Sequence, residues 1–218
     1  MLTFDNGSWR GSPLSVAIQG GVNDAAIRCL IEEGKAKVNG ASATKHNIPL
    51  HLAAFRNRAE VVSMLLKHGA DLEKKNDKGQ TPLEIAKIKN HPAVIKVIYA
   101  AKVNQYINSL ASAVQKATEM NDKFQAQKES GAVPAYRYGG QVFYVTTAIK
   151  FGENACDVLR KNSVAEIILD VLDGKKDIGE LDSYQDALQI GTHLGDLWQQ
   201  IKENYLDKLP KKSPAPVV

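Results

Sequence analysis

The feature that most constrains this chain is a short motif that occurs three times at nearly constant spacing. The segments SPLSVA, IPLHLA and TPLEIA begin at residues 12, 48 and 81, so their prolines lie 36 and 33 residues apart. A period near 33 residues is typical of repeat proteins, in which each unit buries its apolar face against its neighbours. We therefore expect the first half of the chain to be a stack of small units.

Each of these segments contains residues that begin a helix. In the third, Thr81 can cap the first turn through its side-chain oxygen, and Pro82 fits that turn because no amide donor is needed there. Glu84 completes a capping box, in which the two side chains bond reciprocally to the backbone. The pattern predicts a short helix from Pro82 onward and, by the same spacing, from Pro13 and Pro49.

A second helix follows in the middle unit. Its valines and leucines at 61–66 are spaced three and four residues apart, which predicts a helix with one buried side. Asn57 falls where the chain turns between the two helices, and Asn tolerates the left-handed conformation there. Gly69 is expected to end the second helix, and the residues 77–79 to form a tight turn before the next unit.

These residues resemble the ankyrin repeat, whose pattern is DxxGxTPLHxAAxxGxxxVVxLLLxxGAD. The segment IPLHLAAFRNRAEVVSMLLKHGADLEKKN matches that pattern closely, and DKGQTPLEIAKIKNHPAVIKVI is similar to a terminal repeat. The resemblance covers residues 12–100 and departs from the pattern at Thr44 and His46, which replace the usual Asp and Gly. It implies an all-α stack of three repeats that binds another protein, with His51 tying one repeat to the next.

The second half of the chain has helical patterns, and these do not identify a family. No Pro or Gly interrupts residues 93–130, which predicts one long helix or two helices joined near Asn104. A further helical seam follows at three- and four-residue steps. Its members are Val142, Val145, Ile149, Gly152, Cys156 and Leu159.

Two more helix starts follow this seam. Ser163 and Glu166 have the spacing of a second capping box, and Ser183 can begin a last helix. We therefore predict an all-α chain with three parts. These are an ankyrin-repeat domain at 1–100, a helical bundle at 101–209 and a flexible tail at 210–218.

The resemblance also implies a binding surface, because ankyrin stacks bind through hairpin tips and through exposed positions of the first helix in each repeat. The positions that match are Lys45, His46, Asn47, Phe55, Arg56, Lys75, Asn76, Lys78, Ile88 and Lys89. Phe55 and Arg56 are the strongest candidates, since aromatic and Arg side chains dominate interface energetics. The alternative is that Phe55 packs against its own neighbour or the C-terminal bundle. In the second half, Tyr136, Arg137 and Tyr138 either take part in recognition or cover the bundle core.

The charge distribution favours a protein partner with an acidic surface patch. Residues 1–100 contain 14 lysines and arginines against 9 acidic residues, a net charge of +5, whereas residues 101–218 contain 14 against 15. This excess is too small and too scattered for nucleic acid, which usually binds a denser basic stripe. The sequence has neither an apolar run long enough for a bilayer nor a signal-peptide pattern, so we expect no membrane insertion and a cytoplasmic location.

The cysteines suggest no cofactor or metal chemistry. Cys29 and Cys156 lie 127 residues apart with no zinc-ligand spacing, and both are expected to be buried, reduced thiols. With no catalytic, cofactor or metal constellation in view, the leading interpretation is a non-enzymatic adaptor or inhibitor. The architecture is similar to that of ankyrin-repeat effectors of intracellular bacteria, which implies action on a host protein in the host-cell cytoplasm.

Two alternatives from other classes stay open. The first is an enzyme whose helical half is catalytic and whose repeats recruit the substrate, with Cys156 as nucleophile, His193 as base and Asp196 as orienting group. The second is a structural module that associates with itself through the bundle. The oligomeric state is left open by the sequence.

Overall fold

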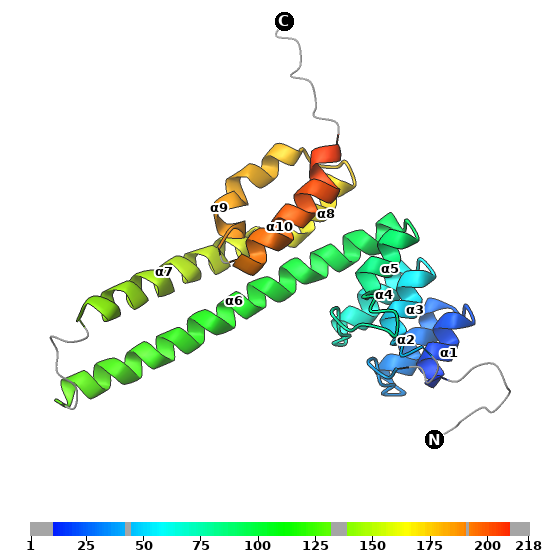
Figure 1. Ribbon diagram of the computed structural model, residues 1–218, viewed down its shortest axis with the longest axis horizontal. Helices are drawn as coiled ribbons and strands as arrows, with labels where there is room; N and C mark the ends of the chain where they lie inside the picture. Colours follow the sequence, from blue (N-terminus) through cyan, green and yellow to red (C-terminus); the bar gives the residue numbers. More distant parts are fainter. Residues whose placement is uncertain (1–10, 42–44, 132–138, 191, 210–218) are drawn as a thin grey trace, which may run out of the picture. The chain divides into compact units, whose positions relative to one another are not determined.

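The computed structural model describes residues 11–41, 45–131, 139–190 and 192–209, without the side chains of 139–144 and 192–196. Every regular element in these ranges is a helix, which confirms the all-α prediction for the described part (Figure 1). The chain divides into two compact units, Met1–Lys102 and Val103–Val218.

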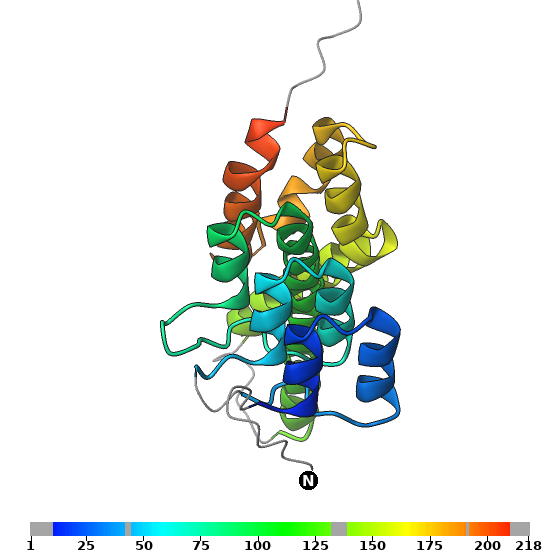
Figure 2. The same cartoon turned by 90° about the vertical axis from the view of Figure 1, so that its right-hand side faces the viewer.

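The first unit is a stack of helix pairs: α1 with α2, α3 with α4, and α5 with the beginning of α6. These helices span Pro13–Gln19, Asp24–Glu32, Pro49–Phe55, Ala59–Lys67, Pro82–Ile88 and Pro92–Glu129. Helix α3 contacts α1 and α5, and α2 contacts α4. The first helices therefore form one layer, and α2 and α4 lie in a second. Figure 2 shows the pairs stacked in chain order.

The starts of the first helices follow the predicted capping chemistry. The Thr81 side chain accepts a hydrogen bond from the backbone N–H of Glu84 at 3.3 Å, and the Glu84 carboxylate accepts one from the Thr81 N–H at 2.6 Å. The capping box is thus confirmed. At α1, Ser12 Oγ accepts from the Ser15 N–H at 3.2 Å. Ile48 has no polar side chain, and α3 therefore begins without a side-chain cap from that position.

The turns between paired helices share one backbone conformation. Gly21, Asn57 and Asn90 have φ angles of 75°, 55° and 53°, and they occupy equivalent positions in the three repeats. This left-handed conformation is what the sequence predicts for Asn57. Gly69, with a φ of 82°, follows the end of α4 as expected. One conformation at one motif position gives each repeat the same reversal.

The core of the first unit lies between its two layers. The first turns of α6 contribute to it through Val94 and Ile98, so this helix completes the third repeat before continuing into the second unit. Fully buried apolar side chains come from every helix of the stack. They include Leu14, Ile18, Ile27, Leu50, Ala53, Val61, Val62, Leu65 and Ala86.

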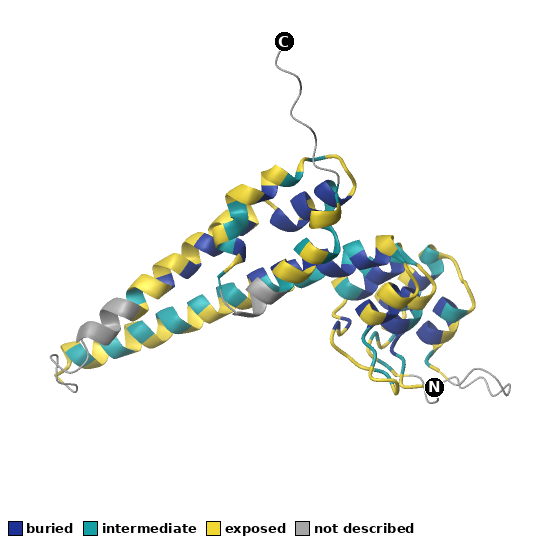
Figure 3. Cartoon of the chain, turned by 45° about the horizontal axis from the view of Figure 1, so that its top comes forward, coloured by how far each residue is buried: buried dark blue, intermediate teal, exposed yellow. Residues whose placement is uncertain are grey.

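The second unit contains the rest of α6 and the helices that follow. These are α7 (Gly139–Lys161), α8 (Val164–Leu172), the 3-10 helix η2 (Ile178–Tyr184), α9 (Gln185–Leu188), α10 (Thr192–Asn204) and the 3-10 helix η3 (Leu206–Lys208). Helix α6 is continuous over 38 residues, so the alternative of two helices joined near Asn104 is wrong. Most of α8 is buried, whereas α6 after Leu110 is exposed or half-buried (Figure 3).

Helices α6 and α7 run side by side in opposite directions (Figures 1 and 3). They come close together at Gly152, where an added Cβ atom would lie 2.6 Å from Cγ2 of Val114. No side chain fits at that distance unless Val114 moves. Of the predicted seam on α7, Ile149, Cys156 and Leu159 are buried, but Val145 is 42% exposed. The Val142 side chain lies outside the described residues.

The two predicted helix starts in this unit have different outcomes. A helix does begin after Ser163, as predicted, but the predicted capping box there is wrong. Ser163 has a left-handed φ of 47° and makes no side-chain cap; its carbonyl instead accepts the Glu166 N–H at 2.8 Å. The chain has only two residues between α7 and α8 in which to reverse, and Ser163 takes part in that reversal. Ser183 lies inside η2, where its hydroxyl donates to the Glu180 carbonyl at 3.1 Å, and the predicted last helix is divided into η2, α9 and α10.

Candidate functional site

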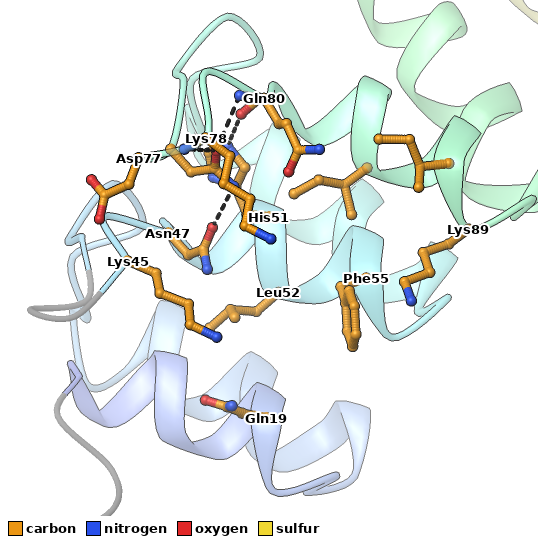
Figure 4. Close-up of a pocket in the computed structure, with 13 residues that line it drawn as sticks. Gln19, Lys45, Asn47, His51, Leu52, Phe55, Asp77, Lys78, Gln80 and Lys89 are labelled. Atoms are coloured by element: carbon orange, nitrogen blue, oxygen red, sulfur yellow. Dashed lines mark hydrogen bonds between the residues drawn. The ribbon is translucent and has the colours of Figure 1, made fainter.

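A hollow of about 510 Å³ lies across the first helices of the repeats and the hairpins that precede them (Figure 4). Its apolar wall comes from α3 and α5, and its polar wall comes mainly from the two hairpins. The lining residues are Gln19, Lys45, Asn47, His51, Leu52, Phe55, Asn76, Asp77, Lys78, Gln80, Ile85, Ile88 and Lys89.

Most of the residues predicted from the motif positions meet around this hollow. Those that line it are Lys45, Asn47, Phe55, Asn76, Lys78, Ile88 and Lys89. The other three do not: His46 and Lys75 are exposed on the hairpins, and Arg56 is the exposed C-cap residue of α3. Of the two strongest candidates, Phe55 therefore lines the hollow and Arg56 does not.

The apolar wall repeats two motif positions. Leu52 and Ile85 are equivalent, and so are Phe55 and Ile88, which are 48% and 65% exposed. Leu52 and Ile85 were missed as site residues because their apolar character fits a core position equally well. Their signal was their place in the motif, one turn before the exposed Phe55 and Ile88. On α1, the polar residue Gln19 occupies the position equivalent to Phe55, so the lining is less apolar in the first repeat.

The two hairpins beside the hollow are joined by hydrogen bonds. Asn76 Nδ2 donates to Asn47 Oδ1 at 3.0 Å, and Asn76 Oδ1 accepts from the backbone N–H groups of Lys78 and Gln80. The Asp77 N–H donates to the Lys45 carbonyl at 3.3 Å. Asn47 and Asn76 therefore fix the shape of the polar wall, because their side chains are hydrogen-bonded to each other.

His51 holds the base of the hollow. It is 1% exposed; its Nδ1 atom accepts the Ile48 N–H at 3.2 Å, and its Nε2 atom lies 3.0 Å from the Gln80 carbonyl oxygen. Burial lowers the pKa of His51 below its ordinary 6.5, which favours the neutral ring that this bonding pattern requires. The predicted tie between neighbouring repeats is confirmed.

The charged groups of the lining give the hollow a positive character. Lys45, Lys78 and Lys89 contribute three ammonium groups, against one carboxylate from Asp77. That carboxylate lies 2.5 Å from Nδ1 of His46. The Lys89 ammonium lies 4.6 Å from the centroid of the Phe55 ring, a cation–π contact that leaves about half of the Phe55 surface exposed.

The described residues bear on the metal and cysteine chemistry considered from the sequence. Within them, no group of three His, Cys, Asp or Glu side chains is arranged to hold a metal ion. Burial raises the pKa of the Cys156 thiol, which is the opposite of what activates a nucleophile. The side chains of His193 and Asp196, and the segment with Tyr136, Arg137 and Tyr138, lie outside the described residues. None of the helices in the described ranges has the length and apolar character that a bilayer span requires.

The remaining cysteine differs from its prediction. Cys29 is exposed on α2, so the expectation that both thiols are buried is wrong for this one. Its α2 neighbours Ile27 and Ile31 take the buried positions. Only the Cys156 thiol is sheltered from solvent.

Tandem helix pairs with a hollow across their first helices are the architecture of a helical repeat protein. Residues 14–109 match the family of ankyrin repeats (3 copies), so this part of the chain is an ankyrin-repeat array. Ankyrin repeats bind other proteins, and the first unit is accordingly a protein–protein interaction module.

Known proteins resemble the chain over part of its length. A putative E3 ubiquitin-protein ligase, XBAT35 of Arabidopsis thaliana, is 38% identical over 88 residues, which are 40% of this chain and 19% of that protein. A putative ankyrin repeat protein of Rickettsia bellii is 37% identical over 78 residues, 34% of this chain and 46% of that protein. The ARF GTPase-activating protein Git of Drosophila melanogaster is 35% identical over 71 residues, 33% of this chain and 9% of that protein. The chain spans less than half of each relative.

Proposed function

We propose that the chain is a non-catalytic adaptor or inhibitor that holds a partner protein on the hollow of its ankyrin array. The observation that carries this proposal is the exposure of two large apolar side chains, Phe55 and Ile88, beside three lysines in one concave site. Large apolar side chains that remain exposed together in a folded protein usually mark an interaction site.

The size of the array bears on how such a partner is held. Three repeats offer a small concave face, so the area of an interface on this face would be near the lower end of the range for specific protein–protein interfaces. In interfaces of this kind a few residues supply most of the binding free energy, and aromatic anchors are prominent among them. Phe55 is the proposed anchor here, since its ring lines the hollow from α3 and is half exposed.

The charge of the lining supports an acidic patch on the partner. Lys45, Lys78 and Lys89 belong to a first half with a net charge of +5, and Asp77 is paired with His46. A basic surface of this kind attracts carboxylates and speeds their encounter. We place this binding in a cytoplasm and propose a bacterial effector that acts on a host protein, which the similarity to the Rickettsia bellii ankyrin repeat protein supports.

The test is the affinity for a partner recovered by affinity capture and identified by mass spectrometry. Phe55→Ala is expected to raise the Kd of the pair at least about tenfold, because it removes the proposed anchor. Arg56→Ala should change the Kd less than about twofold, since Arg56 does not line the hollow. Lys67→Glu, a charge reversal at an exposed position of α4 away from the lining, is the matched control. An unchanged Kd for Phe55→Ala would show that the partner binds elsewhere.

A further inference from the structure

The hollow has positive charge at both ends of an apolar strip. Lys45 and Lys78 come from the two hairpins, whereas Lys89 is the C-cap residue at the opposite end of α5. Leu52, Phe55, Ile85 and Ile88 lie between them. Figure 4 shows this order, with Lys45 and Lys78 toward the hairpins and Lys89 next to the Phe55 ring.

The length of the strip is set by the helices. Helices α3 and α5 have seven residues each. At a rise of 1.5 Å per residue, the two charged ends are separated by about 10 Å along the helix axes. An extended peptide covers about 10 Å in three residues. Two carboxylates that face the two ends would therefore be three or four residues apart in an extended segment.

The lysines are open to such carboxylates. In the described part of the chain, no ion pair joins Lys45, Lys78 or Lys89 to an acidic side chain, although Lys89 contacts the Phe55 ring. Asp77, the acid closest along the chain to Lys78, is paired with His46 on the neighbouring hairpin. Among the described residues, the only carboxylate in the lining of the hollow is thus already paired with His46, and a ligand would not have to displace an acidic side chain from these lysines.

From this arrangement we infer that the hollow binds a short, extended linear segment of the partner, in which one or two large apolar residues are flanked on both sides by Asp or Glu. The inference rests on the proposed function and specifies its ligand. The apolar residues lie on Phe55 and Ile88, one flanking acid pairs with Lys45 or Lys78, and the other pairs with Lys89. A hollow of about 510 Å³ accommodates a few side chains of such a segment.

The test is selection from a phage-displayed library of random 12-residue peptides on the full-length protein. The wild type is expected to select peptides with one or two large apolar residues between acids spaced three or four positions apart. The combined variant Lys45→Glu and Lys78→Glu should lose the acidic preference on one side of the apolar residues only. Lys89→Glu should lose it on the other side. Lys67→Glu should select the wild-type pattern.

One control is needed for the contact between Lys89 and Phe55. Lys89→Glu removes the ammonium from the ring and also adds an anion. Lys89→Gln removes the ammonium without adding an anion, and should weaken the acidic preference on that side without replacing it by a basic one. A synthetic peptide from the wild-type selection should bind Lys89→Glu and the combined Lys45→Glu and Lys78→Glu variant at least about tenfold more weakly, with a smaller salt dependence, and should bind Lys67→Glu as the wild type.

The outcomes separate this inference from the proposed function. Selection of no peptides, peptides without acidic enrichment, or a preference that the lysine substitutions leave unchanged would each overturn it. If the captured partner were still sensitive to Phe55→Ala, the partner would dock as a folded surface and only the inference would fail. If single-stranded DNA displaced the selected peptide at stoichiometric concentration, the site would be one for phosphates and the inference would fail as well.

Discussion

The Nε2 atom of His51 lies 3.0 Å from the carbonyl oxygen of Gln80, which joins α3 to the hairpin that precedes α5. Since Nδ1 of the same ring accepts the Ile48 N–H, the proton is on Nε2 and the ring is neutral. One buried side chain therefore fixes both the start of its own helix and the position of the next repeat, and the hollow is built on this joint.

Stability should depend on pH through His51. Burial lowers its folded-state pKa below the 6.5 of the unfolded chain, so the unfolded state binds more protons between these two values. Its contribution is therefore complete above pH 6.5 and is lost as the pH falls from 6.5 through the folded-state pKa. Urea unfolding followed by circular dichroism at pH 7.5 and 5.0 should show a larger loss of stability for the wild type than for His51→Gln, which does not titrate. Equal losses would contradict this account.

The Thr81–Glu84 capping box should contribute to stability by two routes. Thr81→Ala is expected to lower the free energy of unfolding by about 1 kcal/mol, because the Glu84 N–H loses its acceptor. The hydrogen bond from the Thr81 backbone lowers the pKa of Glu84, so its contribution is present above the ordinary 4.5 and is lost as the pH falls through the lower folded-state value. Acid titration of the urea midpoint should be flatter for Glu84→Gln; an unaltered curve would exclude this role.

Gly152→Ala should destabilise the second unit although Ala favours helices over Gly by about 1 kcal/mol. The new methyl group would meet Val114 at 2.6 Å, and such overpacking costs about 1–3 kcal/mol. Combining it with Val114→Ala makes room for the methyl group. Thermal unfolding of the four proteins of this double-mutant cycle should give a favourable coupling above about 1 kcal/mol. Additive effects would mean that α6 and α7 are not in contact at this point.

Asn57 should tolerate Gly and resist other residues. Its φ of 55° is accessible to Gly without strain, whereas a residue with a Cβ and no polar side chain costs about 1–2 kcal/mol there. Asn57→Gly is therefore expected to leave the urea midpoint unchanged or raise it, and Asn57→Ala to lower it. The same order is expected at Asn90, the equivalent position with a φ of 53°. A more stable Asn57→Ala would refute the argument.

The repeat half of the fold follows from the sequence because its signals are local and recur. The Thr81–Glu84 box, the left-handed Asn57 and the Gly69 helix end each depend on residues within one turn of themselves. Repetition at the same spacing turns weak individual signals into a specific pattern. His51 could be assigned its role for the same reason, since the family motif places a histidine at that position.

The second half was less predictable because its signals depend on tertiary context. Ser163 and Glu166 have capping-box spacing, yet the short connection from α7 forces Ser163 into a left-handed turn in which its hydroxyl cannot cap. Ser183 begins no helix, because η2 already extends on both sides of it. The exposed motif positions around the hollow could be predicted. That Phe55 lines the hollow and Arg56 does not depends on where α3 ends.

The two thiols of the chain differ in what a reagent can reach. Cys29 is exposed on α2, whereas Cys156 is buried on α7, where burial raises the pKa of its thiol and keeps it protonated. A maleimide dye at neutral pH should therefore attach to α2, which contributes no residue to the hollow. The natural sequence thus provides a single attachment point for a fluorophore outside the lining of the hollow, and ligand titrations can be followed by fluorescence without engineering a cysteine.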